Sequence, residues 1–269
     1  MSRGEVTSTE QLLRLAKTAE DDEARWEYVL VLHGQPSREA FEGAVRLCQS
    51  GDLRDRCLGA DVLGQLGTPL MPFRAESVAV LRPMLRDSEA CVVRCAVVAL
   101  GHLQTPDAVA DLMTLRAHPD PEVRHAVAFA LMSHDDPRAV GVLVELSRDS
   151  DAMVRDWATF SLGSLHDADT NDVREALAAR LEDPDGDTRI EALVGLASRR
   201  DARAVAPLSR ALALPQPGHV VVDAARAMGS SDLLPALLGL RDAGWAQNEV
   251  DRRLLDDAIA ACRPVPDLP

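Results

Sequence analysis

Aromatic residues are scarce in this sequence of 269 residues, since Phe, Tyr and Trp together make up 3% of it. A globular enzyme of this size usually relies on more aromatic side chains for its core, whereas stacked helices can pack on Ala, Leu and Val. Hydrophobic residues still make up 46% of the chain and charged residues 27%, which is typical of a folded protein rather than a disordered one. The composition therefore favours an all-helical array.

Positive charge is also in short supply. The formal net charge is -14, and no run of Lys and Arg is longer than the pairs Arg199-Arg200 and Arg252-Arg253. An acidic protein is repelled by phosphate groups, which supply most of the non-specific affinity for nucleic acids. The sequence therefore disfavours DNA, RNA and anionic membranes as partners.

Targeting and membrane-spanning segments are not visible either. The start, MSRGEVTSTEQLL, lacks the apolar region of a signal peptide, and no apolar run approaches the roughly 18 residues of a membrane span. The cysteines are odd in number, and most fall on predicted apolar helix faces: Cys48, Cys57, Cys91, Cys95 and Cys262. They are expected to be reduced core residues of a cytoplasmic, monomeric protein.

What the sequence does contain is an internal repeat. DPEVRHAVAFAL (120–131) returns as DAMVRDWATFSL (151–162), and related copies place an Arg at 56, 94, 124, 155 and 189. A sixth copy carries Val222 at the Arg position, and a degenerate first copy surrounds Arg25. In each copy, apolar residues recur at the spacing of one helical face, and Asp, Ser or Pro precedes them as a helix start. We refer to these helices as the motif helices.

A second amphipathic stretch follows each motif helix, at 106–117, 137–148, 172–182 and 202–213. Each unit is therefore a helix, a turn and a second helix. A single helical hairpin cannot bury its apolar face alone, so neighbouring units must stack. The predicted fold is an all-α solenoid of about fourteen to seventeen helices in antiparallel pairs.

The repeated motifs resemble HEAT repeats of the short bacterial kind named after phycobilin lyases, over residues 21–243. The resemblance implies a right-handed superhelix, with motif helices on the convex side and second helices lining the concave side. It also implies that the repeated Arg side chains bond to neighbouring acidic loops in a ladder. The residues of that ladder would be Arg94, Arg124, Arg155 and Arg189.

One solenoid domain is expected over residues 1–269. Residues 1–49 would form a degenerate repeat and a cap, 50–243 the repeats, and 244–269 a C-terminal cap helix and a Pro-rich tail. The segments 10–19 and 249–262 are predicted cap helices. The tail 263–269 holds three prolines and is expected to be extended.

Catalytic and metal-binding patterns are not found. No Walker loop, GxGxxG or GxSxG motif occurs, and no His is followed by Glu as in the HEAT-like deoxyhypusine hydroxylases. His102, His134 and His166 recur 32 residues apart, but their offsets from the repeat Leu drift, so solvated turns are expected rather than zinc ligands. The acidic loops 167–172 and 183–188 lack the Gly and Glu of an EF-hand. No catalytic residue, cofactor or metal is predicted.

Recognition of another protein is the predicted function, with the chain as a non-catalytic scaffold or adaptor. Two alternatives stay open: a lyase or isomerase acting on a bound small molecule of the tetrapyrrole type, and an acidic immunity or regulatory inhibitor of a basic protein. The partner is expected to be a protein or peptide.

The predicted partner-binding row lies on the second helices. With Val109, Val140, Val173 and Val205 as position zero, positions two and five point away from the core. The resulting candidates are Asp111, Thr114, Val142, Glu145, Glu175, Pro207 and Arg210. The three acids would orient a basic amphipathic helix or peptide, and Val142 and Pro207 would give it apolar footing. A second candidate is an apolar patch on the motif helices that includes Phe129 and Phe160.

Overall fold

The computed structural model describes residues 8–264 apart from 133 and 135, and every regular element among these residues is a helix. The all-α solenoid prediction is confirmed. The chain divides into two compact units, with the boundary between Val142 and Leu143. Both predicted cap helices form, as α1 and α16. Residues 265–269 of the tail that was predicted to be extended lie outside the described residues.

Unit 1 contains the helices α1 (Thr9–Thr18), α2 (Asp22–Gly34), α3 (Arg38–Cys48), α4 (Leu53–Gln65), α5 (Arg74–Met84), α6 (Ala90–Leu103), α7 (Pro106–Met113) and α8 (Pro121–Leu131). Helix α9 (Pro137–Leu146) carries the boundary between the units. The motif helices of this unit are α4, α6 and α8, and the second helices that follow them are α5, α7 and α9.

Unit 2 contains α10 (Ala152–Phe160) with a π-helical turn η1 (Ser161–Leu165), α11 (Asn171–Ala178), α12 (Gly186–Ser198), a 3-10 turn η2 (Ala202–Ala204), α13 (Val205–Leu212), α14 (His219–Met228), a 3-10 turn η3 (Ser231–Leu233), α15 (Leu234–Asp242) and α16 (Glu249–Ala261). Its motif helices are α10, α12 and α14, and its second helices are α11, α13 and α15.

Aspartate caps begin the motif helices α4, α8, α10 and α12, as the sequence predicts. Asp120 accepts a hydrogen bond from the backbone N–H of Glu122 at 2.8 Å, and Pro121 opens α8. Asp151 accepts from the N–H groups of Met153 and Val154, at 3.0 and 3.2 Å. A cap of this kind satisfies donors that have no partner within the helix and contributes about 1 kcal/mol.

The motif helices pack closely against one another within each unit. A methyl group added to Gly64 would lie 2.8 Å from the Cα of Ala99, and one added to Gly101 would lie 2.7 Å from the Cα of Ala130. In unit 2 a methyl group on Gly195 would lie 2.6 Å from the Cα of Gly163. Small residues therefore let successive backbones touch.

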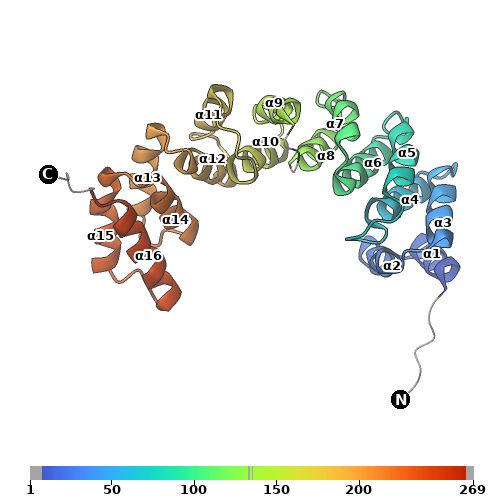
Figure 1. Ribbon diagram of the computed structural model, residues 1–269, viewed down its shortest axis with the longest axis horizontal. Coiled ribbons are helices and arrows are strands. Elements are labelled where there is room, and N and C mark those ends of the chain that lie inside the picture. The colour runs from blue at the N-terminus through green and yellow to red at the C-terminus, as the bar shows by residue number, and fades with distance from the viewer. Residues whose placement is uncertain (1–7, 133, 135, 265–269) are drawn as a thin grey trace, which may run out of the picture. The chain divides into compact units, whose positions relative to one another are not determined.

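Each unit curves toward its motif helices for this reason. Second helices such as α5 and α7 pack less closely against one another than α6 packs against α4 and α8. Figure 1 shows α4, α6 and α8 on the inner side of the bend of unit 1, and α12, α14 and α16 on the inner side of unit 2. The expectation that second helices line the concave side is therefore wrong within each unit, because Gly and Ala shorten the distance between motif helices.

The arginine ladder forms with a constant geometry. Arg56 donates to the carbonyl oxygens of the residues six and five positions before it and to both carboxylate oxygens of Asp87 in the next repeat, at 2.9 and 3.0 Å. Arg155 repeats both features with Asp183, at 3.0 and 3.1 Å. Arg124 and Arg189 also donate to the carbonyl groups six and five positions before them. The structural role implied for these arginines is confirmed.

Arg94 departs from the ladder. Its side chain makes no hydrogen bond to a loop carbonyl group or a carboxylate among the described residues, and its recorded contact is the Sγ atom of Cys95 at 4.0 Å. The prediction that Arg94 belongs to the ladder is wrong, because its guanidinium group lies instead beside a group of cysteines on α4 and α6.

Candidate functional site

The predicted partner-binding row falls on both units. Asp111, Thr114 and Val142 lie in unit 1, and Glu145, Glu175, Pro207 and Arg210 lie in unit 2. Thr114 and Glu145 are exposed, and Pro207 is half-buried. Thr114 directly follows α7, and the other residues lie within α7, α9, α11 and α13. They therefore lie on the outer layer of their units (Figure 1).

Three charges of this row are already paired within the protein. Asp111 accepts from Arg82 at 2.6 Å, Glu175 accepts from Arg203 at 2.7 Å, and Arg210 lies 3.3 Å from Glu182. An ion pair on a surface lowers the charge that either partner can offer to a ligand. The row therefore offers less negative charge to a basic partner than its sequence indicates.

Val142 is wrongly placed in the predicted row, because only 2% of it is exposed. The buried stripe of α9 consists of Ala139, Val142, Leu143 and Leu146, which follow a helical spacing of three and four. Val140, which served as the first residue of the stripe, is only half-buried. The true stripe begins one residue earlier, so position two faces the core.

A groove between α10 and α12 collects aromatic and acidic side chains on the motif-helix layer of unit 2. Asp156, Trp157 and Phe160 come from α10, and Asp187, Ile190 and Glu191 come from α12. The groove has a volume of about 400 Å3. The rings of Trp157 and Phe160 meet edge to face, with centroids 6.1 Å apart. We call these six residues the α10/α12 groove.

The carboxylates of the α10/α12 groove lack positive partners. Among the described residues, no Lys, Arg or His forms a recorded ion pair with Asp156, Asp187 or Glu191, and Glu191 accepts one hydrogen bond, from Ser164 at 3.0 Å. Burial raises the pKa of Asp156 above its usual value, and the nearby carboxylates of Asp185 and Asp187 raise it further. Burial and the charges of Asp156 and Asp187 likewise raise the pKa of Glu191. Negative charge is therefore concentrated here at a cost to stability.

Replacing Asp156 by Asn should raise the melting temperature at pH 7. The folded-state pKa of Asp156 is raised above its unfolded value, so its ionised form destabilises the folded state, and this cost is absent when the group is protonated. The gain should therefore shrink as the pH falls through the raised folded-state pKa and be largely lost below about pH 4, where Asp156 is mostly protonated in both states. Thermal unfolding of both proteins at pH 7 and pH 3.5 measures this; a variant that melts lower at pH 7 contradicts it.

The second sequence candidate, the patch with Phe129 and Phe160, is only partly exposed. Both phenylalanines are half-buried, and Cys95 and Ala99 at the equivalent positions of α6 are buried. Phe129 contacts His102 edge to face, with ring centroids 5.3 Å apart. Of this patch, Phe160 and Ile190 belong to the α10/α12 groove.

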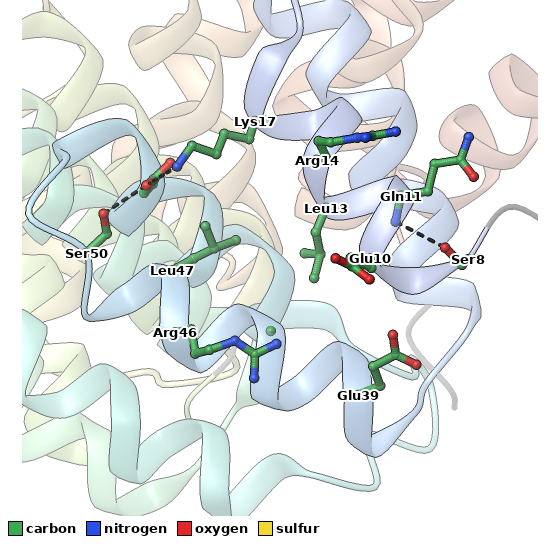
Figure 2. Close-up of a pocket in the computed structure, with 12 residues that line it drawn as sticks. Ser8, Glu10, Gln11, Leu13, Arg14, Lys17, Glu39, Arg46, Leu47 and Ser50 are labelled. Carbon is green, nitrogen blue, oxygen red and sulfur yellow. Dashed lines mark hydrogen bonds and ion pairs between the residues drawn. The ribbon is translucent and has the colours of Figure 1, made fainter.

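A cavity of about 850 Å3 lies between α1 and α3 in unit 1. Figure 2 shows Glu10 and Arg14 from α1 and Glu39 and Arg46 from α3 along its walls, so both signs of charge alternate. At one end, buried Asp55 accepts hydrogen bonds from Lys17 at 2.7 Å and Ser50 at 2.8 Å. These bonds fasten the N-terminal helix to α4, so the polar groups at this end have a structural role.

Within the described residues, no group of three or more His, Cys, Asp or Glu side chains has an arrangement that could hold a metal ion. None of the described helices combines the length and the apolar character needed to cross a bilayer.

Stacked helical hairpins with a repeated Arg-to-loop ladder define an α-solenoid of short repeats. The family of HEAT repeats matches residues 78–163 and 109–185. Protein YibA of Escherichia coli strain K12 is 28% identical over 216 residues, which cover 78% of this chain and 76% of YibA, and its counterpart from strain O157:H7 gives the same values. Residues 78–185 of this chain are therefore similar to HEAT repeats, and the chain is similar to YibA over most of its length.

Solved structures support the fold. The crystal structure of Escherichia coli YibA superposes with a TM-score of 0.82 at 24% identity and covers 95% of this chain and 92% of its own. An engineered protein superposes with a TM-score of 0.60 at 21% identity, over 94% of this chain and 78% of its own. At these identities the similarity concerns the arrangement of helices.

Sequence analysis missed Trp157, Asp187 and Glu191 as candidate site residues. A signal was present, because equivalent positions of adjacent repeats stack against one another. Asp156 and Ile190 both follow the motif Arg of their repeats, and Trp157 and Glu191 both come one residue later. An alignment of the repeats would have placed Trp157 beside Glu191, on the helix face that also carries Phe160.

Proposed function

We propose that this protein is a non-catalytic scaffold that binds a basic segment of another protein in the α10/α12 groove. The observation that carries the proposal is a pair of aromatic rings flanked by three carboxylates that have no recorded ion pair among the described residues. A Lys or Arg side chain suits this groove, since it can bind an aromatic ring and pair with carboxylates.

The electrostatics favour this kind of partner. Asp156 and Glu191 have raised pKa values because both groups are partly buried and are repelled by nearby carboxylates. A bound cation would relieve the repulsion between these carboxylates. This relief would contribute favourably to the binding free energy. The net charge of -14 would steer a basic segment toward the protein from a distance.

The groove also fits the architecture of repeat proteins. It lies on the inner layer of its unit, and solenoids commonly use such surfaces to hold a helix or peptide. The same chemistry suits an acidic inhibitor of a basic protein, and the identity of the partner separates an adaptor from an inhibitor.

A labelled amphipathic peptide of about 15 residues, with Arg and Lys on one face, tests the proposal by fluorescence anisotropy. Asp187→Lys combined with Glu191→Lys should weaken its binding more than tenfold, which corresponds to about 1.4 kcal/mol. Binding by the unchanged protein should also weaken as salt rises, because the interaction is ionic. An equivalent peptide with Glu in place of Arg and Lys should not bind.

A matched control lies on the outer layer. Glu145→Arg combined with Glu175→Arg introduces the same number of charge reversals in the row predicted from sequence, and it should change the affinity less than twofold. If this control weakens binding tenfold while the groove variant does not, the binding site is the second-helix row and the proposal fails. Melting temperatures of both variants show whether either effect comes from unfolding.

A further inference from the structure

Three of the five cysteines line one cavity in unit 1. Cys57 lies on α4, and Cys91 and Cys95 lie one turn apart on α6. The cavity has a volume of about 530 Å3. Cys57 and Cys95 are buried, whereas Cys91 is exposed, so the three thiol groups run from the core to the surface.

Repeat stacking brings these cysteines together. Cys57 follows the motif arginine Arg56, and Cys95 follows the motif arginine Arg94, so both occupy the same position of adjacent repeats. Helices α4 and α6 approach closely, because Gly64 lies against Ala99. The three cysteines therefore line one cavity where two packed helices face each other, rather than lying on a loop.

The surroundings of Cys57 favour its thiolate form. Hydrogen bonding from the thiol of Cys95 has the largest effect and, with smaller contributions from Cys91 and Arg94, lowers the pKa of Cys57 to about 7 despite its burial. Arg94 can take this role because its side chain contacts Cys95 and does not take part in the arginine ladder. By contrast, burial raises the pKa of Cys48 to about 12 and also raises that of Cys262. The cavity therefore holds a thiol group unlike the other buried ones.

We propose that Cys57, Cys91 and Cys95 form a redox-sensitive thiol site, in which a hydroperoxide converts Cys57 and Cys91 into a disulfide that links α4 and α6. The cavity gives a small oxidant access to Cys57, and the exposed Cys91 can reach the oxidised sulfur from the surface side. This site is separate from the α10/α12 groove and does not depend on the proposed binding function.

The reaction takes place in two steps. The thiolate sulfur of Cys57 attacks the terminal oxygen of the hydroperoxide, the O–O bond breaks, and the leaving alkoxide or hydroxide takes a proton from water. Cys57 is now a sulfenic acid. The sulfur of Cys91 then loses its proton and attacks the Cys57 sulfur, the S–O bond breaks, and hydroxide leaves and is protonated to water. The two sulfur atoms give up two electrons, and the peroxide accepts them.

Cys95 acts as a positioning residue in this scheme. Its thiol stays protonated, since the hydrogen bond to Cys57 and burial both raise its pKa. A protonated thiol can donate to the Cys57 thiolate without competing for the oxidant, because only the thiolate is a strong nucleophile.

Alkylation of the full-length protein at pH 7 provides the first test. Iodoacetamide is small enough for the cavity, and peptide mass spectrometry measures the rate at each cysteine. Cys57 should react about tenfold faster than Cys91, because its pKa is lowered to about 7 whereas the pKa of Cys91 is raised. Exposure alone predicts the opposite order, so faster alkylation of Cys91 overturns the proposal. Cys95→Ala, which removes the hydrogen-bond donor, should slow the reaction of Cys57 severalfold.

Oxidation provides the second test. Treatment with hydrogen peroxide should yield a peptide that joins Cys57 to Cys91, and Cys91→Ser should instead leave a sulfenic acid at Cys57 that dimedone traps. Cys57→Ser should abolish both products, whereas Cys48→Ser, the matched buried control, should change neither. Circular dichroism checks that each variant is folded. A disulfide between other cysteines, or no product at Cys57, contradicts the assignment.

Discussion

Replacing Asp183 by alanine is expected to destabilise unit 2 by about 3–5 kcal/mol, the range observed when one partner of a buried ion pair is removed. Asp183 accepts two hydrogen bonds from Arg155, one from Arg180 at 3.0 Å and one from the backbone N–H of Asp185 at 3.0 Å. Only 1% of the Asp183 side chain is exposed. Its loss would leave the Arg155 guanidinium group buried without a carboxylate.

The pKa of Asp183 gives the expected pH dependence. Burial alone would raise this pKa, but the hydrogen bonds from Arg155 and the Asp185 N–H outweigh burial and hold it below its usual value. A carboxyl group with a lowered folded-state pKa stabilises the protein above its unfolded pKa, and this contribution is lost as the pH falls through the folded pKa. The difference between the unchanged protein and Asp183→Ala should therefore be full at pH 7 and shrink below about pH 4.

Thermal unfolding followed by circular dichroism measures the effect, which corresponds to a decrease of roughly 6–20 °C in melting temperature. Asp187→Ala is the matched control, because Asp187 lies four residues away, is exposed and has no recorded ion pair among the described residues. It should change the melting temperature by less than about 2 °C. Equal effects of the two substitutions would mean that the arginine ladder contributes little to stability.

The sequence predicts the parts of this fold that depend on local chemistry. Asp120 and Asp151 cap helices because an acid before an apolar periodic run is a local signal, and α1 and α16 follow the same rules. The role of Arg155 could be inferred because its motif recurs in register with acidic loops. These features need only residue type and spacing.

The parts that depend on tertiary contacts could not be predicted in the same way. Val142 was assigned to the surface because Val140 and Ala139 are both plausible starts of the α9 stripe, and only packing selects Ala139. The inner layer of each unit is set by contacts such as Gly64 against Ala99, which a single helix does not reveal. The candidate sites follow from stacking, since the α10/α12 groove and the three-cysteine cavity each join residues of adjacent repeats.

Close approach of helices also makes Gly163 sensitive to substitution. A methyl group on Gly163 would lie 2.7 Å from the backbone carbonyl oxygen of Glu191 and 3.4 Å from the Cα of Gly195. Both obstacles are backbone atoms of α12, so they cannot move without displacing that helix. Gly239 in α15 offers the opposite case, because nothing lies within 4 Å of the place where its methyl group would be.

Gly163→Ala should therefore destabilise unit 2 by about 1–3 kcal/mol, the usual cost of overpacking. Gly239→Ala should stabilise it by about 0.5–1 kcal/mol, because Ala restricts the unfolded chain and favours a helix at an exposed interior position. The same chemical change thus takes opposite signs at two sites. Chemical unfolding with urea measures both free energies. If Gly163→Ala also stabilises the protein, the backbones of η1 and α12 can separate freely, and the curvature of unit 2 does not depend on their contact.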